Sequence, residues 1–430
     1  MSEYPEGVYA LPESLDPEAY LIGTYIFQAE TADYFKFGGA VAIEQSTGSW
    51  VRLPQETAEL VDAHGVRVID VFEVPDHEFD SPAGERTFVL KLAFPIVNIG
   101  YQLPMLLNTV FGVVSLMGVV KMVDLELPKS YVEHFPGPQF GVDGMRAAAR
   151  VPERPFFAGI IKPSVGLRPE QAGELFYQMA LGGVDLIKDD EKMGEVSYSS
   201  VVERVKACMA AEERAFEETG GRTYYAVNIT ASPAQMLQNA RAALDAGANM
   251  LMLSHLTVGI GALQDLVAAI DGAVPILTHP DFQGVLSRPP DFGLSSHLTI
   301  GKLPRLAGVD VSDFPMPYGS VRVAKEKYFK IALALQSPFH GLKRAWAQTG
   351  GAMHPGVIPQ VVADLGCDVL LTAGGAVHAH PMGTRAGAAA LGQAVEAVMA
   401  GRDLRDAAKE HKELAAAIDA WGIYGEESGV

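Results

Sequence analysis

Cysteine is scarce in this chain, because Cys208 and Cys367 are the only two among 430 residues. Two cysteines build no disulfide framework, so we expect a reducing, cytoplasmic setting. Residues 1–16 carry acids and prolines instead of the basic-then-apolar pattern of a secretory signal, which agrees with that expectation. Neither cysteine belongs to a zinc-ligand pattern or to the partner arrangement of a thiol nucleophile.

Positive charge and long apolar runs are also in short supply. The chain has 33 Lys and Arg against 52 Asp and Glu, a net charge of −19. Such an acidic surface repels phosphate backbones, which argues against nucleic acids and anionic membranes as partners. The longest uncharged run, Leu103–Val120, is broken by proline and glycine. It therefore predicts a helix, a turn and a strand in a folded core instead of a membrane span.

Apolar residues make up 48% of the chain, which is ample for a barrel of about 250 residues plus a smaller domain. An N-terminal α+β domain is expected over residues 1–140, and a Pro/Gly-rich linker, Phe135–Gly141, lies at its end. Its predicted strands are Tyr20–Phe27, Val66–Val74, Arg86–Ala93 and Val119–Leu125, and its predicted helices are Tyr34–Gln45 and Leu103–Phe111.

After Arg154 short apolar runs alternate with amphipathic helices. The predicted strands are Phe156–Ile161, Val184–Lys188, Tyr224–Ile229, Met250–Leu253, Pro275–Thr278, Gly308–Val311, Ala345–Thr349 and Asp368–Thr372. Helices are expected at Pro169–Leu181, Ser199–Thr219, Pro233–Ala246, with Ser232 placed to cap it, and Met382–Ala400. This rhythm predicts an α/β fold, a (β/α)8 TIM barrel over residues 141–400, followed by a helical tail over 401–430.

Four charged residues end the second predicted barrel strand: Lys188, Asp189, Asp190 and Glu191. Side chains alternate along a strand, so Lys188 and Asp190 share one side and Asp189 takes the other. Mg2+ prefers oxygen ligands, and an ammonium repels it. Lys188 therefore joins a metal site only if it is modified, for example by CO2 to a carbamate. The alternative is a local ion pair at a strand-to-helix turn.

Polar residues also end the neighbouring strands, which favours a functional site at this rim of the barrel. These residues are Lys162, Asn228, Ser254 with His255, and His279. The last two strands end in glycine pairs, at Thr349-Gly350-Gly351 and Gly374-Gly375. Glycine lets backbone N–H groups approach an anion, and loops at these two positions commonly bind phosphate in this fold. His378 and His380 are expected to be structural.

Three segments carry a resemblance to a known family: Gly159–Pro163, Gly182–Glu191 and Glu44–Trp50. The chain resembles the ribulose-bisphosphate carboxylase large subunit, and more closely its non-carboxylating relatives, the RuBisCO-like proteins. Within these it is most similar to the methionine-salvage enolase and isomerase branch, as Gly182–Glu191, Pro315–Ser320 and Gly374–His378 indicate. The resemblance implies a homodimer or larger homo-oligomer.

The resemblance also assigns roles to residues. It implies a carbamate on Lys188, Mg2+ held by Lys188, Asp190 and Glu191, proton transfer by Lys162, and an active-site histidine at His279. The phosphate cradle it implies comprises Thr349, Gly350, Gly351, Gly374 and Gly375. The residues expected to complete the partner subunit's site are Glu44, Ser49, Trp50 and Thr109.

Departures from the carboxylase pattern point away from CO2 fixation. Ser164 stands where carboxylases carry a second lysine, Thr109 replaces an asparagine, and Pro280 replaces an arginine for the second phosphate. The loop Ser312–Gly319 offers no lysine at the place of the mobile-loop lysine. What the resemblance leaves is enolisation of a singly phosphorylated compound, since Mg2+ polarises a ketone oxygen and eases removal of a neighbouring proton.

Several reactions fit these residues. Isomerisation of 5-methylthioribulose 1-phosphate is the first expectation, because Val113 stands where the enolase is thought to carry its lysine base. Alternatives are the 2,3-diketo-5-methylthiopentyl-1-phosphate enolase reaction and decarboxylation of a phosphorylated 3-oxo sugar acid. A catalytically silent protein with a binding or regulatory role is the alternative of another class.

Overall fold

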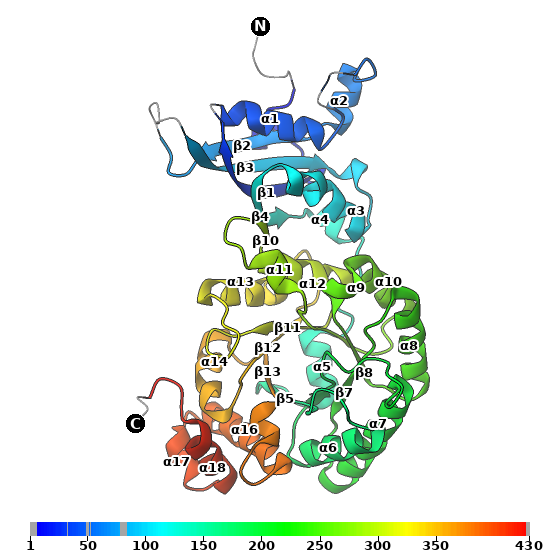
Figure 1. Ribbon diagram of the computed structural model, residues 1–430, viewed down its shortest axis with the longest axis vertical. Helices are drawn as coiled ribbons and strands as arrows, with labels where there is room; N and C mark the ends of the chain where they lie inside the picture. The colour runs from blue at the N-terminus through cyan, green and yellow to red at the C-terminus, as the bar shows by residue number, and fades with distance from the viewer. Residues whose placement is uncertain (1–6, 32, 49–50, 52, 78–83, 427–430) are drawn as a thin grey trace. The chain divides into compact units, whose positions relative to one another are not determined.

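The structure, a computed structural model, describes residues 7–31, 33–48, 51, 53–77 and 84–426 (Figure 1). It forms two units. The N-terminal unit comprises residues 1–136, 282–299 and 339–342, and the barrel unit comprises residues 137–281, 300–338 and 343–430. The chain thus passes from the first unit to the second within the predicted linker, between Pro136 and Gly137. Among the described residues, no helix is long and apolar enough to cross a membrane.

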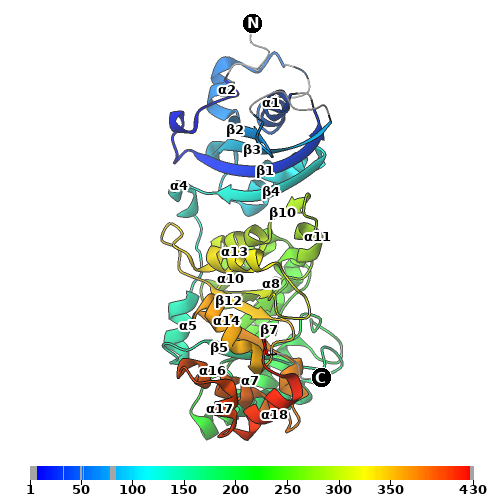
Figure 2. The ribbon, with the colours of Figure 1, turned by 90° about the vertical axis from the view of Figure 1, so that its left-hand side faces the viewer.

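The N-terminal unit is built on a five-stranded sheet in the order β10-β4-β1-β3-β2, and α1 covers one of its faces (Figures 1 and 2). Side chains on β1 alternate between buried and half-buried, as expected for a strand with one face on a core. The strands are β1 (Tyr20–Glu30), β2 (Arg67–Glu73), β3 (Glu85–Pro95), β4 (Val119–Glu126) and β10 (Gly293–Leu294). The helices are α1 (Tyr34–Glu44), α2 (Ala58–His64), α3 (Leu103–Leu107), α4 (Lys129–Val132) and α11 (Gln283–Ser287).

The barrel unit is a closed parallel barrel in the order β11-β12-β13-β5-β6-β7-β8-β9. Its strands are β5 (Phe156–Ile160), β6 (Leu186–Lys188), β7 (Tyr224–Asn228), β8 (Met250–Leu253), β9 (Ile276–Thr278), β11 (Val311–Pro315), β12 (Trp346–Gly350) and β13 (Val369–Ala373). The fold class expected from the sequence, a TIM barrel with a smaller α+β domain, is confirmed.

Helices follow the barrel strands, and one more helix, α5, precedes the first of these strands (Figure 1). They are α5 (Gly141–Ala149), α6 (Pro169–Leu181), α7 (Val201–Thr219), α8 (Pro233–Asp245), α9 (His255–Val258), α10 (Ile260–Ile270), α12 (Leu303–Ala307), α13 (Lys325–Gln336), α14 (Ile358–Leu365), α15 (Gly375–His378) and α16 (Thr384–Met399). The predicted tail helix is two helices, α17 (Leu404–Ala408) and α18 (Lys412–Trp421), which pack on α16.

Two local predictions were wrong. Ser232 occupies the N-cap position of α8, but its side chain makes no capping hydrogen bond. The sixth barrel strand was expected at Gly308–Val311, whereas β11 begins at Val311 and runs to Pro315. Gly308 adopts φ +117° after α12, so it ends that helix instead of opening a strand. Ser312 and Asp313 therefore lie on a strand and not in a loop.

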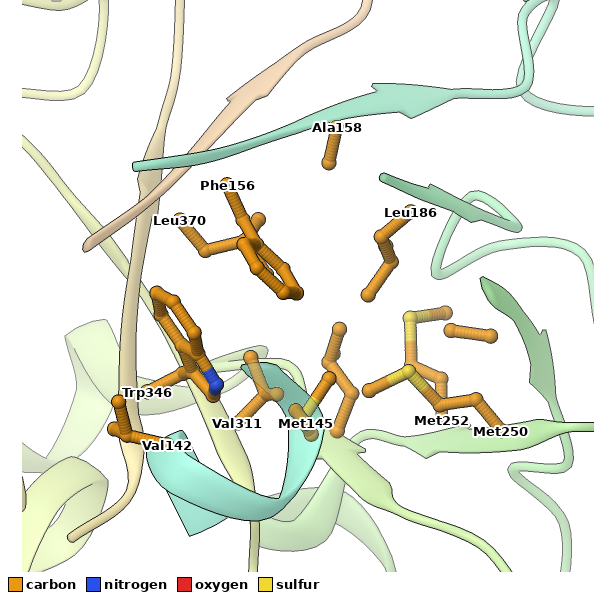
Figure 3. Packing of buried hydrophobic residues seen from close by; sticks show 12 residues of the cluster. Val142, Met145, Phe156, Ala158, Leu186, Met250, Met252, Val311, Trp346 and Leu370 are labelled. Atoms are coloured by element: carbon orange, nitrogen blue, oxygen red, sulfur yellow. The ribbon is translucent and has the colours of Figure 1, made fainter. Parts of the chain in front are cut away.

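Large apolar side chains fill the interior of the barrel, among them residues at the amino ends of β5, β6 and β12 (Figure 3). Phe156, Leu186, Met252 and Trp346 contribute to this cluster from four different strands, and α5 adds Val142 and Met145. Figure 3 shows Phe156 and Trp346 facing each other, with ring centroids 4.4 Å apart. Because apolar side chains fill the interior toward the amino ends of the strands, a polar site is expected at the carboxyl ends of the strands.

Arg146 packs against Trp346 of this core. It is 8% exposed, its guanidinium lies 4.7 Å from the Trp346 ring, and it pairs with Asp368 at 2.7 Å. It also donates to the carbonyl oxygens of Val151 at 3.0 Å and Cys367 at 2.8 Å. One buried side chain thus joins α5 to the residues just before β13.

We predict that Arg146→Met lowers the free energy of unfolding by about 3 kcal/mol, because it leaves buried acceptors without a donor. Arg344 pairs with the same Asp368 but is 39% exposed, so Arg344→Met is the matched control and should cost less than about 1 kcal/mol. Urea unfolding of both variants measures the difference. Equal losses would contradict the role assigned to Arg146.

Candidate functional site

The carboxyl ends of the barrel strands carry polar side chains at regular positions. The core residues Leu186, Ala226, Leu277, Val311, Trp346 and Leu370 point into the barrel. Two residues further along each strand, on the same face, the polar residues are Lys188, Asn228, His279, Asp313, Gln348 and Thr372. All of these except His279 are buried. The barrel interior therefore changes from apolar to polar within one layer.

Lys188 belongs to this layer and is fully buried. Its Nζ lies 3.3 Å from the Asp189 carbonyl oxygen and 4.0 Å from Glu191 Oε2. Asp190, also buried, accepts a hydrogen bond from Lys162 of the loop after β5. Lys162 Nζ in turn donates to Ser164 Oγ at 3.0 Å. The structure thus brings the predicted residues Lys162, Lys188, Asp190 and Glu191 together.

Asp189 points away from this group, as strand alternation predicts. Its Oδ1 accepts from the Tyr225 hydroxyl at 2.8 Å, and its Oδ2 accepts from the Asn228 backbone N–H at 3.0 Å and from Arg204 Nε at 3.2 Å. Asn228 also donates through Nδ2 to the Glu191 carbonyl oxygen at 2.9 Å. Asp189 and Asn228 thus hold the backbone that carries Asp190 and Glu191.

His279 joins the group from the end of β9. Its Nε2 lies 3.7 Å from Glu191 Oε2 and 3.5 Å from Asp313 Oδ2, and its Nδ1 lies 3.1 Å from Asp281 Oδ2. Burial acts to raise the pKa of Asp281, but the hydrogen bond and charge of His279 outweigh it, so this pKa lies below its usual value. Burial raises the pKa of Asp313.

Sequence analysis missed three residues of this layer: Asp313, Gln348 and Thr372. The Gln348 amide and the Thr372 hydroxyl are buried without a hydrogen-bond partner among the described residues, which marks them as candidate contacts for a bound molecule. Counting two residues onward from each apolar core position would have found Gln348 and Thr372. Asp313 was missed because its strand was predicted too early.

The glycine pairs differ in what surrounds them. Gly351 adopts φ +85°, and a Cβ on Gly374 would lie 3.3 Å from Lys162 Cε. A Cβ on Gly375, at the start of α15, would meet no atom within 4 Å. The structure places the Thr349 hydroxyl in the barrel wall, where it donates to the Phe314 carbonyl oxygen at 3.1 Å. Gly350 is a buried residue of β12.

Two other histidines lie against backbone carbonyl oxygens, and a third is buried. His378 Nε2 lies 2.9 Å from the Ile160 carbonyl oxygen, and burial lowers the pKa of His378. His380 Nε2 lies 2.9 Å from the Glu413 carbonyl oxygen. His255 is fully buried at the start of α9, while the preceding Ser254 donates to Asp281 at 2.7 Å.

The residues expected to serve a partner subunit belong to the N-terminal unit. Glu44 is exposed at the end of α1, and Thr109 is half-buried in the π-helical turn Asn108–Gly112 that continues α3. Ser49 and Trp50 lie outside the described residues.

The rim offers two carboxylates and one amine to a divalent cation. Across the described residues, no group of three or more His, Cys, Asp or Glu side chains is arranged to hold a metal. Asp190 and Glu191 supply two carboxylates, and the third group beside them is the Lys188 amine. The donor set fits Mg2+ once Lys188 carries a carboxylate, because that change supplies a third oxygen donor and removes a positive charge.

Comparison with known proteins identifies related sequences over nearly the whole chain. The family described as ribulose bisphosphate carboxylase large chain matches with its catalytic domain over residues 141–421 and with its N-terminal domain over residues 13–131. A ribulose bisphosphate carboxylase-like protein of Archaeoglobus fulgidus is 42% identical over 414 residues, 95% of each chain. A 2,3-diketo-5-methylthiopentyl-1-phosphate enolase of Geobacillus kaustophilus is 37% identical over 95% of this chain and 99% of its own.

Solved structures agree with these matches. A RuBisCO-like protein (MtnW) from Alicyclobacillus acidocaldarius superposes with a TM-score of 0.88 at 32% identity, covering 95% of this chain and 100% of that one. The dimeric archaeal Rubisco of Hyperthermus butylicus gives a TM-score of 0.86 at 28% identity, covering 96% of this chain and 98% of its own. An octameric Rubisco of Pyrococcus horikoshii gives 0.89 at 28% identity, covering 97% of each chain.

We predict that Gly374→Ala lowers kcat by about tenfold, because the new Cβ displaces Lys162 from its position beside Asp190. Gly375→Ala is the matched comparison, since its Cβ meets no protein atom and leaves Lys162 in place. Steady-state kinetics should show a kcat loss for the first variant and, if phosphate lies on this surface, a raised KM for the second. Unchanged kcat in Gly374→Ala would contradict the expected displacement of Lys162.

Proposed function

The chain belongs to the ribulose bisphosphate carboxylase large-chain family, and from this premise we propose that it catalyses magnesium-dependent enolisation of a phosphorylated keto compound and fixes no CO2. One observation carries the proposal. The metal-site candidates Lys188, Asp190 and Glu191 are grouped at the barrel mouth, while Ser164 occupies the position of the carboxylases' second lysine and is bound to Lys162.

We assign the metal to carbamylated Lys188, Asp190 and Glu191. When bound there, Mg2+ supplies Lewis-acid polarisation of a substrate carbonyl. Burial of Lys188 and Asp190 keeps water away from these groups, so their charges act in a medium of low dielectric constant. The hydrogen bonds from Asn228 to the carbonyl oxygens of Glu191, at 2.9 Å, and Asp190, at 3.4 Å, fix the backbone of this segment.

Proton transfer is assigned to Lys162, to the Lys188 carbamate and to His279. Lys162 reaches Asp190 from the loop after β5 and lies against Gly374, so its amine is held at the mouth between β5, β6 and β13. His279 faces the same group from the end of β9, and its Nδ1 lies 3.1 Å from Asp281 Oδ2. A base on one side and an acid on the other suit removal of a proton from one carbon and its return to a neighbour.

The charges around the mouth suit a substrate with one phosphate. Beside His279 lie the carboxylates of Asp281 and Asp313. A second phosphate near them would be repelled, whereas the glycine-rich backbone at Gly351 and Gly375 follows β12 and β13. The phosphate therefore binds on the β12 and β13 side and the distal group lies toward β9 and β11.

The first candidate substrate is 2,3-diketo-5-methylthiopentyl 1-phosphate, after the name that relatives of 37% identity carry. These relatives reverse the order expected from sequence alone, in which isomerisation of 5-methylthioribulose 1-phosphate came first. That isomerisation remains the second candidate, because Val113 is a 47% exposed apolar residue where a lysine base was expected. No relative named here supports the other two alternatives, decarboxylation and a catalytically silent binding protein.

We propose further that a second copy of this chain completes the site. Solved relatives are dimeric or octameric. The segment containing Thr109 exposes apolar side chains, among them Met105 at 45%, Val113 at 47% and Leu116 at 83%. Such a surface is typical of a protein–protein contact.

Solvent-proton exchange tests the proposed chemistry. In D2O with Mg2+ and bicarbonate, the protein should replace a C–H proton of the diketone phosphate with deuterium. NMR follows this exchange. Lys188→Ala should slow this exchange at least about 100-fold while circular dichroism stays unchanged. Lys192→Ala, which removes a 63% exposed lysine beside the same carboxylates, is the control and should retain exchange. Full exchange in Lys188→Ala would refute the assignment.

Adding a lysine at position 113 separates the two candidate reactions. If the protein is the isomerase, Val113→Lys should gain exchange on the diketone phosphate that the parent lacks, because an amine then replaces the apolar side chain. If the protein is the enolase, the parent is already active on that compound. Activity of the parent on the ketose phosphate alone, unaltered by Val113→Lys, would contradict the role given to position 113.

A further inference from the structure

The proposed function leaves Arg204 without a role, although it is a fully buried charge close to the site. Arg204 lies in the first turns of α7 and pairs with Asp189, itself 1% exposed, with its NH2 atom 3.1 Å from Asp189 Oδ2. A buried ion pair of this kind contributes little net stability compared with apolar packing of the same volume. Stability alone is therefore a weak reason for its presence.

The hydrogen bonds of Arg204 bracket the two metal-site carboxylates along the chain. On one side its Nε donates to Asp189, the residue before Asp190. On the other side it donates to the carbonyl oxygens of Met193 at 3.1 Å, Gly194 at 3.0 Å and Ser199 at 2.6 Å. The planar guanidinium has a fixed geometry, so it holds both ends of the segment Asp190–Lys192 at fixed positions.

Two further contacts strengthen this clamp. The Tyr225 hydroxyl donates to the second oxygen of Asp189 at 2.8 Å, which leaves the carboxylate no freedom to rotate. Glu195 Oε2 accepts the Val201 backbone N–H at 2.8 Å and ties the loop after β6 to the start of α7. Although burial opposes the charged form, Asp189 holds the pKa of Arg204 above its usual value, so the ion pair persists.

We propose that Arg204 is a positioning residue for the divalent cation. It touches neither metal nor substrate, but through Asp189 and the carbonyl oxygens of the following loop it fixes the directions in which Asp190 and Glu191 project. The inference rests on the proposed function, because it concerns the same metal site. Groups that orient metal ligands in this way typically change metal affinity 10- to 100-fold when removed.

Arg305 provides a matched control within the same barrel. It is 1% exposed and likewise donates to backbone carbonyl oxygens, those of Ala334 at 3.0 Å, Ser337 at 2.7 Å and Lys343 at 3.0 Å. These acceptors belong to α13 and the segment after it and not to the loop that carries Asp190. Arg305→Met therefore removes a comparable buried clamp without loosening the metal-site residues.

The test is calorimetric titration of each variant with Mg2+ in the presence of bicarbonate, alongside thermal unfolding. Arg204→Met should raise the Mg2+ dissociation constant about 10- to 100-fold. Arg305→Met should leave it unchanged while lowering the melting temperature by a similar amount. Tyr225→Phe removes one hydrogen bond to Asp189 with little loss of packing, so it should weaken Mg2+ binding in the same direction and to a smaller extent.

A double variant separates orientation from charge. Arg204→Met combined with Asp189→Asn leaves no unpaired buried charge, yet Mg2+ binding should stay weak because the loop is still unclamped. Wild-type affinity in Arg204→Met, in Tyr225→Phe or in the double variant would overturn the proposal, as would equal weakening by Arg305→Met. Absence of Mg2+ binding in the wild type would overturn the metal assignment itself, which distinguishes failure of the proposed function from failure of this inference.

Discussion

The site depends on charges that the fold brings together at the end of β6. Lys188 and Asp190 are buried, and Glu191 Oε2 lies 4.0 Å from Lys188 Nζ. Lys162 donates a hydrogen bond to Asp190. Buried charges are costly unless each is paired, and here the carboxylates of Asp281 and Asp313 near His279 add further negative charge. A carbamate on Lys188 replaces one positive charge with one negative charge, and a divalent cation adds two positive charges, so loading the site with both would leave the net charge of this layer unchanged.

The same charges divide the mouth into regions with different chemical character. Amines lie on the β5 and β6 side, carboxylates around His279 lie on the β9 and β11 side, and glycine-rich backbone follows β12 and β13. A molecule with one phosphate, a polarisable carbonyl and an uncharged distal group matches this order. Fixing CO2 on a bisphosphate would, by the resemblance to the carboxylases, need cations where Ser164 and Pro280 stand.

Much of this was predictable from the sequence. The alternation of short apolar runs with helices gave the barrel, and charges at successive strand ends located the rim, because strand ends of a parallel barrel meet on one face. The β11 boundary was predicted too early because Gly308 was expected to open a strand, whereas it ends α12, and Asp313 was missed for the same reason. The partners of Asp189 could not be predicted from the sequence, because Tyr225 and Arg204 belong to separate elements that only the folded chain brings together.

The central claim is that Lys188 becomes an oxygen ligand for Mg2+ beside Asp190 and Glu191. A crystal structure of the protein grown with Mg2+ and bicarbonate tests it most directly. The account predicts electron density for a carboxylate continuous with Lys188 Nζ and a cation in contact with that group, Asp190 and Glu191. An unmodified Lys188, with Asp190 still bound to Lys162 and no cation beside it, would contradict the account.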